Sequence, residues 1–220
     1  MTSTLKELRI LVTAGPTREP IDPVRFISNR SSGKMGYAIA AQAVMSGAKV
    51  TLVSGPVSIK PPNGARLVKV ETAGEMYKEV ISRFSDSDIV IKAAAVSDYR
   101  PRDIVRKKIK KKTKQLNLPL VANPDILEEI GKRKRPGQII VGFALETEDL
   151  IANAKKKLKT KNCDMIVAND VSVPGAGFEL DTNIVSIIYP DGHVESLAKM
   201  KKDEIARQIL RRVVRLIRSQ

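Results

Sequence analysis

The sequence predicts an α/β fold, a doubly wound and mostly parallel sheet of the Rossmann-like kind, with a small β-hairpin appendage near the C-terminus. Two observations support this fold class. Short runs rich in β-branched residues alternate along the chain with segments of helical periodicity. The strand-like runs are apolar almost throughout, which is typical of parallel strands that are buried on both faces.

The length of 220 residues fits a single domain over residues 1–220, since neither an internal repeat nor a linker divides the chain. Hydrophobic residues make up 42% of the sequence, which is enough for a sizeable core and argues against disorder. The longest apolar run is far shorter than the ~20 residues that a membrane helix needs, and the N-terminus lacks a signal-peptide layout. We therefore expect a soluble, cytoplasmic protein without a membrane partner.

Each element is expected where the apolar pattern changes its period. The runs RILVTA, KVTLVS and IVIKAAA have strand character. Segments with apolar residues at helical spacing lie between such runs and after them. In the first half of the chain the strands are expected at 9–14, 49–54, 67–70 and 89–95, and the helices at 33–46 and 73–84.

The second half continues the alternation and ends differently. Pro190, Asp191 and Gly192 form a turn between two short strands, which predicts a hairpin. The last helix is amphipathic, with apolar residues at helical spacing facing inward and arginines outward. The strands are expected at 115–121, 139–144, 165–168, 184–189 and 193–197, and the helices at 125–132, 149–159 and 201–218.

Charge is the clearest compositional feature. Lys and Arg number 39 against 24 Asp and Glu, so the net charge is +15 and an anionic partner is expected. Residues 100–114 hold nine Lys or Arg and one Asp, have no apolar face, and contain Pro101, which disfavours a helix. We interpret this stretch as a mobile basic loop of the kind that closes over phosphates. A solvated surface is the alternative for each basic cluster.

Ligands of such sheets bind outside the carboxyl ends of the strands. Polar residues follow each of these ends, for example after Gly15, at Asp98 and at Asn169, which indicates one shared cleft. The small residues Ala93, Ala94 and Ala95 would let a planar ligand approach the backbone, and Asp98 would hold a ribose hydroxyl or a metal. A packed strand end with Asp98 capping a turn is the alternative.

The segment SNRSSGKMG (28–36) matches neither the Walker A pattern nor the dinucleotide fingerprint. Small polar residues before a helix still leave free backbone N–H groups, which form an anion site. We expect such a site at Ser31, Ser32 and Gly33, flanked by charged or amide side chains. A serine N-cap at Ser31 or Ser32 is the alternative. The flanking residues are Arg25, Asn29, Arg30 and Lys34.

The sequence contains no evident pair of nucleophile and base. Its one histidine, His193, falls in the predicted hairpin turn, and its one cysteine, Cys163, is interpreted as a buried small apolar residue. Chemistry would then depend on positioning and charge stabilisation, as in phosphoryl or nucleotidyl transfer assisted by cations and Mg²⁺.

Residues 13–36 (TAGPTREPIDPVRFISNRSSGKMG) closely resemble phosphopantothenoylcysteine synthetase, the ligase of coenzyme A biosynthesis. The resemblance spans nearly the whole chain in the same order. It continues through AAVSDYR (94–100), KIKK (108–111), NPDI (123–126), VGFALET (141–147) and ANDV (168–171).

The resemblance implies a reaction that joins 4′-phosphopantothenate to L-cysteine. The carboxylate first attacks the α-phosphate of CTP, giving an acyl-cytidylate and pyrophosphate, and the cysteine amine then displaces CMP. The intact KIKK and NPDI motifs match the CTP-dependent type of this family more closely than the ATP-preferring animal enzymes. Mg²⁺ is the expected accompanying ion, and its ligands are not identified.

The resemblance also assigns site residues. Lys108 matches the lysine that forms the acyl intermediate, Asn29 matches an asparagine that binds it, and Arg25 matches a nearby arginine. An amide N–H of Asn29 would donate to the acyl oxygen, and Phe143 would provide a flat surface for a base. Nucleotide or phosphate contacts are expected at Gly15, Ser31, Ser32, Gly33, Ala93, Ala94, Ala95, Asp98, Lys108, Asn123, Pro124, Asp125, Ile126, Phe143, Lys157 and Lys161.

The family is dimeric, with an extension of each subunit covering the other's site, and the hairpin at 184–197 is a candidate dimer contact. Whether the ligase is free-standing or half of a fusion with a flavin-dependent decarboxylase is left open. A basic nucleic-acid-binding module is an alternative function, weakened by 4% aromatic residues and the lack of a binding motif. A Rossmann-type oxidoreductase is another, weakened by the missing glycine fingerprint.

Overall fold

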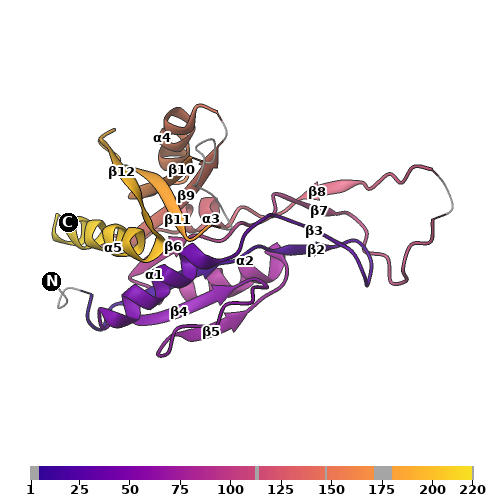
Figure 1. Cartoon of the computed structure of the whole chain (residues 1–220), viewed down its shortest axis with the longest axis horizontal. Helices are drawn as coiled ribbons and strands as arrows, with labels where there is room; N and C mark the ends of the chain where they lie inside the picture. Colours follow the sequence, from indigo (N-terminus) through magenta and orange to yellow (C-terminus); the bar gives the residue numbers. More distant parts are fainter. Residues whose placement is uncertain (1–4, 112–113, 147, 171–179, 220) are drawn as a thin grey trace.

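A central sheet of eight strands dominates the computed structural model, which describes residues 5–111, 114–146, 148–170 and 180–219 (Figure 1). Six of these strands are parallel and the last two are antiparallel, so the predicted fold class is confirmed. In spatial order the strands are β12 (Val194–Lys201), β11 (Thr182–Ile188), β10 (Met165–Asp170), β9 (Ile139–Glu146), β6 (Ile89–Lys92), β1 (Arg9–Ala14), β4 (Lys49–Ser54) and β5 (Arg66–Lys69).

Helices cover both faces of the sheet and create two cores. Successive residues of a strand point to opposite faces, so Val12 joins one core and Leu11 the other. This explains why the parallel strands are apolar almost throughout. The helices are α1 (Lys34–Met45) and α5 (Lys202–Arg218) on one face, and α2 (Ala73–Phe84), α3 (Ile126–Lys132) and α4 (Leu150–Thr160) on the other.

Close packing of α1 on β1 depends on a glycine. A Cβ at Gly36 would lie 2.6 Å from the Ala14 Cβ, so no larger residue fits there. The predicted amphipathicity of the last helix is confirmed, because Ile205, Ile209 and Val213 of α5 are fully buried. The predicted start of α3 is also confirmed, since the Asp125 carboxylate accepts a hydrogen bond from the Glu128 N–H at 3.0 Å.

The hairpin near the C-terminus forms as predicted, but it is not a separate appendage. Its first strand, β11, pairs with β10 and thereby extends the main sheet. Burial is the physical reason, because Val185, Ile187 and Ile188 face the two cores and need the neighbouring strand and helices for cover.

Two predicted strands differ in length or place. The strand expected at 89–95 ends at Lys92, and the one expected at 115–121 shrinks to β8 (Leu120–Ala122). β8 pairs with β7 (Tyr99–Pro101) outside the main sheet, and β2 (Arg18–Pro20) pairs with β3 (Phe26–Ser28) in a second ribbon. Strands of three residues are too short to show the alternation of apolar and polar residues, so the sequence did not predict them.

These two ribbons and the described chain around them, residues 18–28, 99–111 and 114–122, form an arm that projects from the body of the molecule (Figure 1). The buried Asp22 carboxylate joins its two halves. It accepts hydrogen bonds from the Arg25 guanidinium and from the Ile109 N–H at 3.0 Å, and both keep the Asp22 pKa below its usual range. The described residues of the basic segment, 100–111 and 114, therefore belong to an arm with internal contacts.

Parts of three predicted features fall outside the described residues: positions 112 and 113 of the basic segment, Thr147 and Val171. Within the described part of the chain, each helix is too short or too polar to cross a lipid bilayer.

Candidate active site

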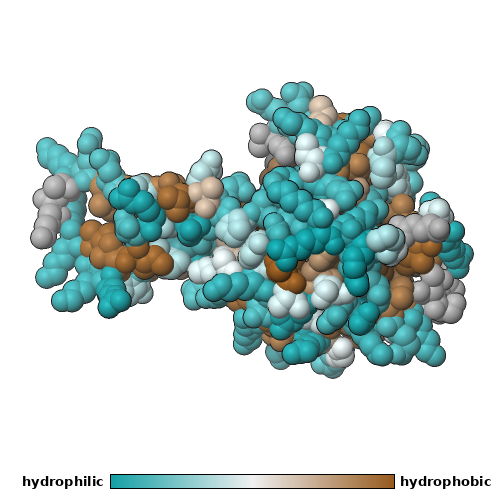
Figure 2. All heavy atoms as spheres, turned by 180° about the vertical axis from the view of Figure 1, so that it is seen from behind, coloured by the Kyte–Doolittle hydropathy of each residue, from teal (hydrophilic) through white to brown (hydrophobic). Residues whose placement is uncertain are grey.

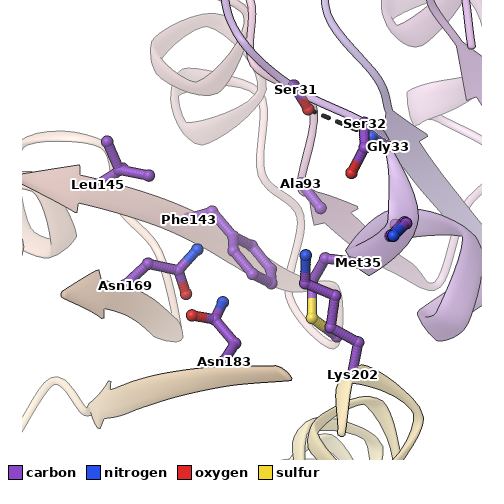
Figure 3. Close-up of a pocket in the computed structure, with 12 residues that line it drawn as sticks. Ser31, Ser32, Gly33, Met35, Ala93, Phe143, Leu145, Asn169, Asn183 and Lys202 are labelled. Atoms are coloured by element: carbon purple, nitrogen blue, oxygen red, sulfur yellow. Dashed lines mark hydrogen bonds between the residues drawn. The ribbon is translucent and has the colours of Figure 1, made fainter. Parts of the chain in front are cut away.

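The N-terminus of α1 opens into a pocket at the carboxyl end of the sheet, called here the α1 pocket (Figure 3). Gly33 is the N-cap, with a left-handed φ of 76° and no side chain capping the first turn. Gly15 packs directly against it, its Cα lying 3.3 Å from where a Gly33 Cβ would stand. The pocket is lined by Ser31, Ser32, Gly33, Lys34, Met35, Gly36, Ala93, Phe143, Leu145, Asn169, Asn183 and Lys202.

The predicted anion site at residues 31–33 thus faces a real pocket, whereas the alternative of a serine N-cap is wrong. Ser31 instead accepts a hydrogen bond from the Gly33 N–H at 3.3 Å, shown as the dashed line in Figure 3. Gly33 has no side chain that could cap the first turn of α1, and the positive end of the helix dipole faces the pocket.

The opposite wall of the α1 pocket comes from β9, β10, β11 and the start of α5, whose side chains converge in Figure 3. Burial, helped by the nearby Lys34 ammonium and opposed by Asp181, lowers the pKa of Lys202 to about 8. The buried Oδ1 of Asn169 has no hydrogen-bond partner among the described residues. A helix N-terminus with two lysines in one pocket is suited to an anionic group.

Sequence reasoning identified one side of this pocket and missed most of the other. Asn169 was noted only as a polar strand end, and Asn183 and Lys202 were not singled out. Asn183 and Lys202 lie where the hairpin and the last helix join the edge of the sheet. No local pattern marks them, because only the packing of that edge brings them to α1.

A second group of expected residues, called here the α3–α4 cluster, lies on the other face of the sheet. Asn123 links it to the end of β6, donating from Nδ2 to the Ser97 carbonyl at 2.9 Å and from its backbone N–H to the Asp98 carbonyl at 2.8 Å. Lys161 pairs with Glu128 at 2.6 Å and with Asp125 at 3.1 Å. The cluster comprises Asp98, Asn123, Pro124, Asp125, Ile126, Lys157 and Lys161.

The expected nucleotide contacts are therefore divided between two places. Phe143 and Ala93 line the α1 pocket, whereas their strand neighbours Lys92 and Gly142 face the α3–α4 side. Ala94 is buried, with its N–H bonded to the Thr13 hydroxyl at 3.1 Å. The alternation of side chains along a strand is the physical reason for the division.

Asn29 lies between the arm and the end of β6. Its amide nitrogen donates to the carbonyl oxygens of Ala95 and Val96, at 3.2 and 3.1 Å. Donation to an acyl oxygen, as the resemblance implies, would require the amide to leave these carbonyls. In this conformation Asn29 instead fixes the chain that leads to Asp98.

Lys108 and Arg25 lie together on the arm and do not line the α1 pocket. Arg25 is bonded to Asp22 and donates to the Ile109 carbonyl at 3.2 Å, so the neighbouring Lys108 is held close to it along the chain. Lys108 itself is exposed. Among the described residues no cluster of three or more His, Cys, Asp or Glu side chains is placed to hold a metal.

Comparison with known proteins gives consistent results. The family described as "DNA/pantothenate metabolism flavoprotein C-terminal domain" matches residues 5–217. The coenzyme A biosynthesis bifunctional protein CoaBC of Bacillus subtilis is 49% identical over 213 residues, which cover 96% of this chain and 52% of that protein. The chain thus spans about half the length of this curated relative.

Two solved structures share the fold. The C-terminal domain of a coenzyme A biosynthesis bifunctional protein CoaBC aligns with a TM-score of 0.84 and 44% identity over 99% of both chains. A Cab2 mutant, H337A, in complex with phosphopantothenate-cysteine aligns with a TM-score of 0.73 and 19% identity, covering 93% of this chain and 86% of that one. The second likeness concerns the fold alone.

Proposed function

Because this chain belongs to the DNA/pantothenate metabolism flavoprotein C-terminal domain family, we propose that it is a phosphopantothenate–cysteine ligase acting in coenzyme A biosynthesis. The observation that carries the proposal is the α1 pocket, where the glycine-capped N-terminus of α1 and Lys34 lie across from Phe143 and Lys202. Support also comes from the Cab2 structure of the same fold, which holds phosphopantothenate-cysteine.

In the proposed reaction the substrates carry most of the charge. The 4′-phosphopantothenate carboxylate attacks the α-phosphorus of CTP, the bond to the β-phosphate breaks, and pyrophosphate leaves. The amine of L-cysteine then attacks the acyl carbon, loses a proton, and displaces CMP. Each step concentrates negative charge, so fixed cations and backbone N–H groups are the appropriate catalysts.

The two sites of the sheet edge suit different parts of these substrates. The α1 pocket would hold an anionic group on the helix N-terminus, with Lys34 and Lys202 adding charge. In the α3–α4 cluster, the exposed Asp98 would accept a ribose hydroxyl and Lys157 would face phosphate oxygens. The acyl group and the α-phosphate would meet near Asn29, which touches the end of β6 between the two sites.

We expect Mg²⁺ to arrive bound to the triphosphate. The described residues offer no cage of protein ligands, and this fits an ion that is held mainly by phosphates and water. When bound, Mg²⁺ neutralises part of the phosphate charge. Asp98 and Asp125 are exposed carboxylates among the expected nucleotide contacts.

The proposal extends to a homodimer formed through the arm. Figure 2 shows hydrophobic side chains gathered on the arm, which lies at the left of that view. Such a patch is unusual on a solvent-exposed extension and indicates a partner surface. Of nine exposed large hydrophobic residues in the described chain, seven lie on the arm: Val24, Phe26, Tyr99, Ile104, Val105, Leu116 and Leu120. The hairpin of β11 and β12 provides no comparable patch.

A second copy of the chain is the proposed occupant of this surface. Lys108 and Arg25 stand on the arm, away from the pocket of their own chain, and would reach the active site of the partner. The basic side chains of residues 100–114 would then face the partner's bound triphosphate, which accounts for their concentration there.

Ile104→Glu should convert the dimer into a monomer, because a carboxylate on a 61%-exposed arm residue would be buried unpaired at the interface. Sedimentation velocity at micromolar concentration measures the change, and activity should fall with the dimer fraction. Met45→Glu is the matched control, since Met45 is 75% exposed on α1 and should leave the mass unchanged. An Ile104→Glu protein that remains a dimer contradicts the arm interface.

Pyrophosphate release before cysteine addition tests the proposed reaction directly. Enzyme, CTP, Mg²⁺ and 4′-phosphopantothenate without cysteine should release about one pyrophosphate per active site, because the acyl-cytidylate forms and stays bound. ATP should release much less in the same coupled assay. Pantothenate, which lacks the phosphate, is the control substrate and should give no burst. A mixture that releases pyrophosphate only after cysteine is added contradicts the two-step mechanism.

A further inference from the structure

Lys92 is a lysine in an unusual place. It is the last residue of β6, in the middle of the sheet, and is paired in register with Thr13 of β1 and Gly142 of β9. Ile91 before it belongs to the core under α1 and α5, so Lys92 faces the other side, towards α3 and α4. That side is crowded, because a Cβ at Gly142 would lie 2.6 Å from the Ile166 side chain.

The ionisable groups around Lys92 come from four segments. Lys157 faces it from α4, Asp125 from the start of α3, Asp98 from the chain after β6, and Cys163 from the chain before β10. Desolvation, helped by Lys157 and opposed by the two carboxylates, lowers the pKa of Lys92 to about 8. All of these neighbours except Cys163 belong to the α3–α4 cluster.

Lys92 makes no hydrogen bond or ion pair within the part of the chain that the structure describes. Other lysines in comparable burial have partners. Lys134 pairs with Asp164 at 2.6 Å, both side chains being about 15% exposed, and Lys161 pairs with Glu128. Lys92 is half-buried. Holding a half-buried lysine without an anionic partner among the described residues is unfavourable, so this arrangement at the carboxyl end of the sheet indicates a binding role.

We propose that Lys92 binds a phosphate group of the nucleotide, acting together with Lys157 across the α3–α4 cluster. This inference rests on the proposed ligase function and names a residue that the family motifs do not include. A phosphate between the two ammonium groups would give Lys92 the anionic partner it lacks and would screen its repulsion from Lys157. Asp98 and Asp125 keep Lys92 in place when the nucleotide has left.

Lys92→Met tests the proposal, since methionine keeps the length of the side chain without its charge. The Kd for CTP with Mg²⁺, measured by calorimetry, should rise about 10-fold, as expected for loss of one charge-assisted hydrogen bond. The Kd for 4′-phosphopantothenate should not change. Lys159→Met, at an exposed position of α4, is the matched control and should bind CTP like the wild type.

The pH dependence separates a binding role from a structural one. Only protonated Lys92 attracts phosphate, so wild-type CTP affinity should be constant below pH 8 and fall as the pH rises above it. The CTP affinity of Lys92→Met should not decrease in this way as the pH rises. Lys159→Met should keep the decrease, because Lys159 is exposed on α4 and lies outside the α3–α4 cluster.

The possible outcomes distinguish the two proposals. Equal CTP affinity and the same pH profile in wild type and Lys92→Met overturn the role of Lys92 and leave the ligase function intact. A changed melting temperature with unchanged Kd also overturns it, in favour of a structural lysine. A wild-type protein that neither binds CTP nor releases pyrophosphate overturns the ligase function and the role of Lys92 with it.

Discussion

Lys108→Ala should lower turnover by about 10³-fold and leave the melting temperature unchanged. A cation delivered in trans to a transferring phosphoryl group typically contributes a factor of this order, as arginine fingers do. Lys108 is exposed on the arm and has no ion pair among the described residues, so its loss should not disturb folding. Steady-state kinetics and thermal denaturation by circular dichroism measure the two quantities.

Lys110→Ala is the matched control for this prediction. Lys110 is exposed on the same segment, two residues further along, and its removal changes the net charge by the same amount. A similar loss of activity in both variants would show that the arm acts through its overall charge. Unfolding of Lys108→Ala would contradict the exposed position that the structure gives this residue.

Asn29→Ala should lower kcat by about 100-fold, corresponding to ~3 kcal/mol of transition-state stabilisation by an oxyanion-hole type of donor. The structure adds a condition, because the Asn29 amide now donates to the Ala95 and Val96 carbonyls. It must turn towards the acyl oxygen during the reaction. The pyrophosphate burst without cysteine should slow in parallel with kcat.

A purely structural Asn29 would behave differently. If it only fixes the chain after β6, alanine should raise KM for CTP and lower the melting temperature with little change in kcat. Ser28→Ala is the matched control, since the Ser28 hydroxyl donates to the Thr17 carbonyl at 2.8 Å in the same part of the arm. Loss of that hydrogen bond should leave kcat near the wild-type value.

Mixing the Lys108→Ala and Asn29→Ala proteins tests whether the active site is shared between two subunits. If Lys108 acts on the partner's Asn29, random exchange of subunits gives dimers with one intact site, and about a quarter of wild-type activity should return. If both residues act within one chain, each site of the mixed dimer lacks one of them, and no activity should return. Activity that stays absent after verified subunit exchange would place Lys108 and Asn29 in the same chain.

The fold was predictable from the sequence because buried parallel strands leave a strong local pattern. RILVTA became β1 and KVTLVS became β4 with the predicted bounds, and the helix at 73–84 formed as expected. The arm was not predictable in the same way. Its strands have three residues each. β7 and β8 lie far apart in the sequence, so no local pattern predicts that they pair.

The site was predictable only in part. The turn before α1 indicated an anion site because a helix N-terminus is a local feature, and the α1 pocket lies there. The placement of Phe143 away from the α3–α4 cluster, and the contribution of Asn183 and Lys202, depend on which face each strand residue occupies. The hydrogen bonds that hold the Asn29 amide were equally hidden, since they join residues 66 and 67 positions apart.

By itself, therefore, the sequence determined the α/β fold class and the family, because these depend on local periodicity and on contiguous motifs. Only the tertiary structure decided that the described residues of the basic segment 100–114 belong to a projecting arm, and that the expected nucleotide contacts separate onto two faces of the sheet. It also decided that Lys92 stands half-buried, without an ion-pair partner among the described residues. The physical reason is that these features depend on contacts between distant segments, and such contacts form only when the sheet has assembled.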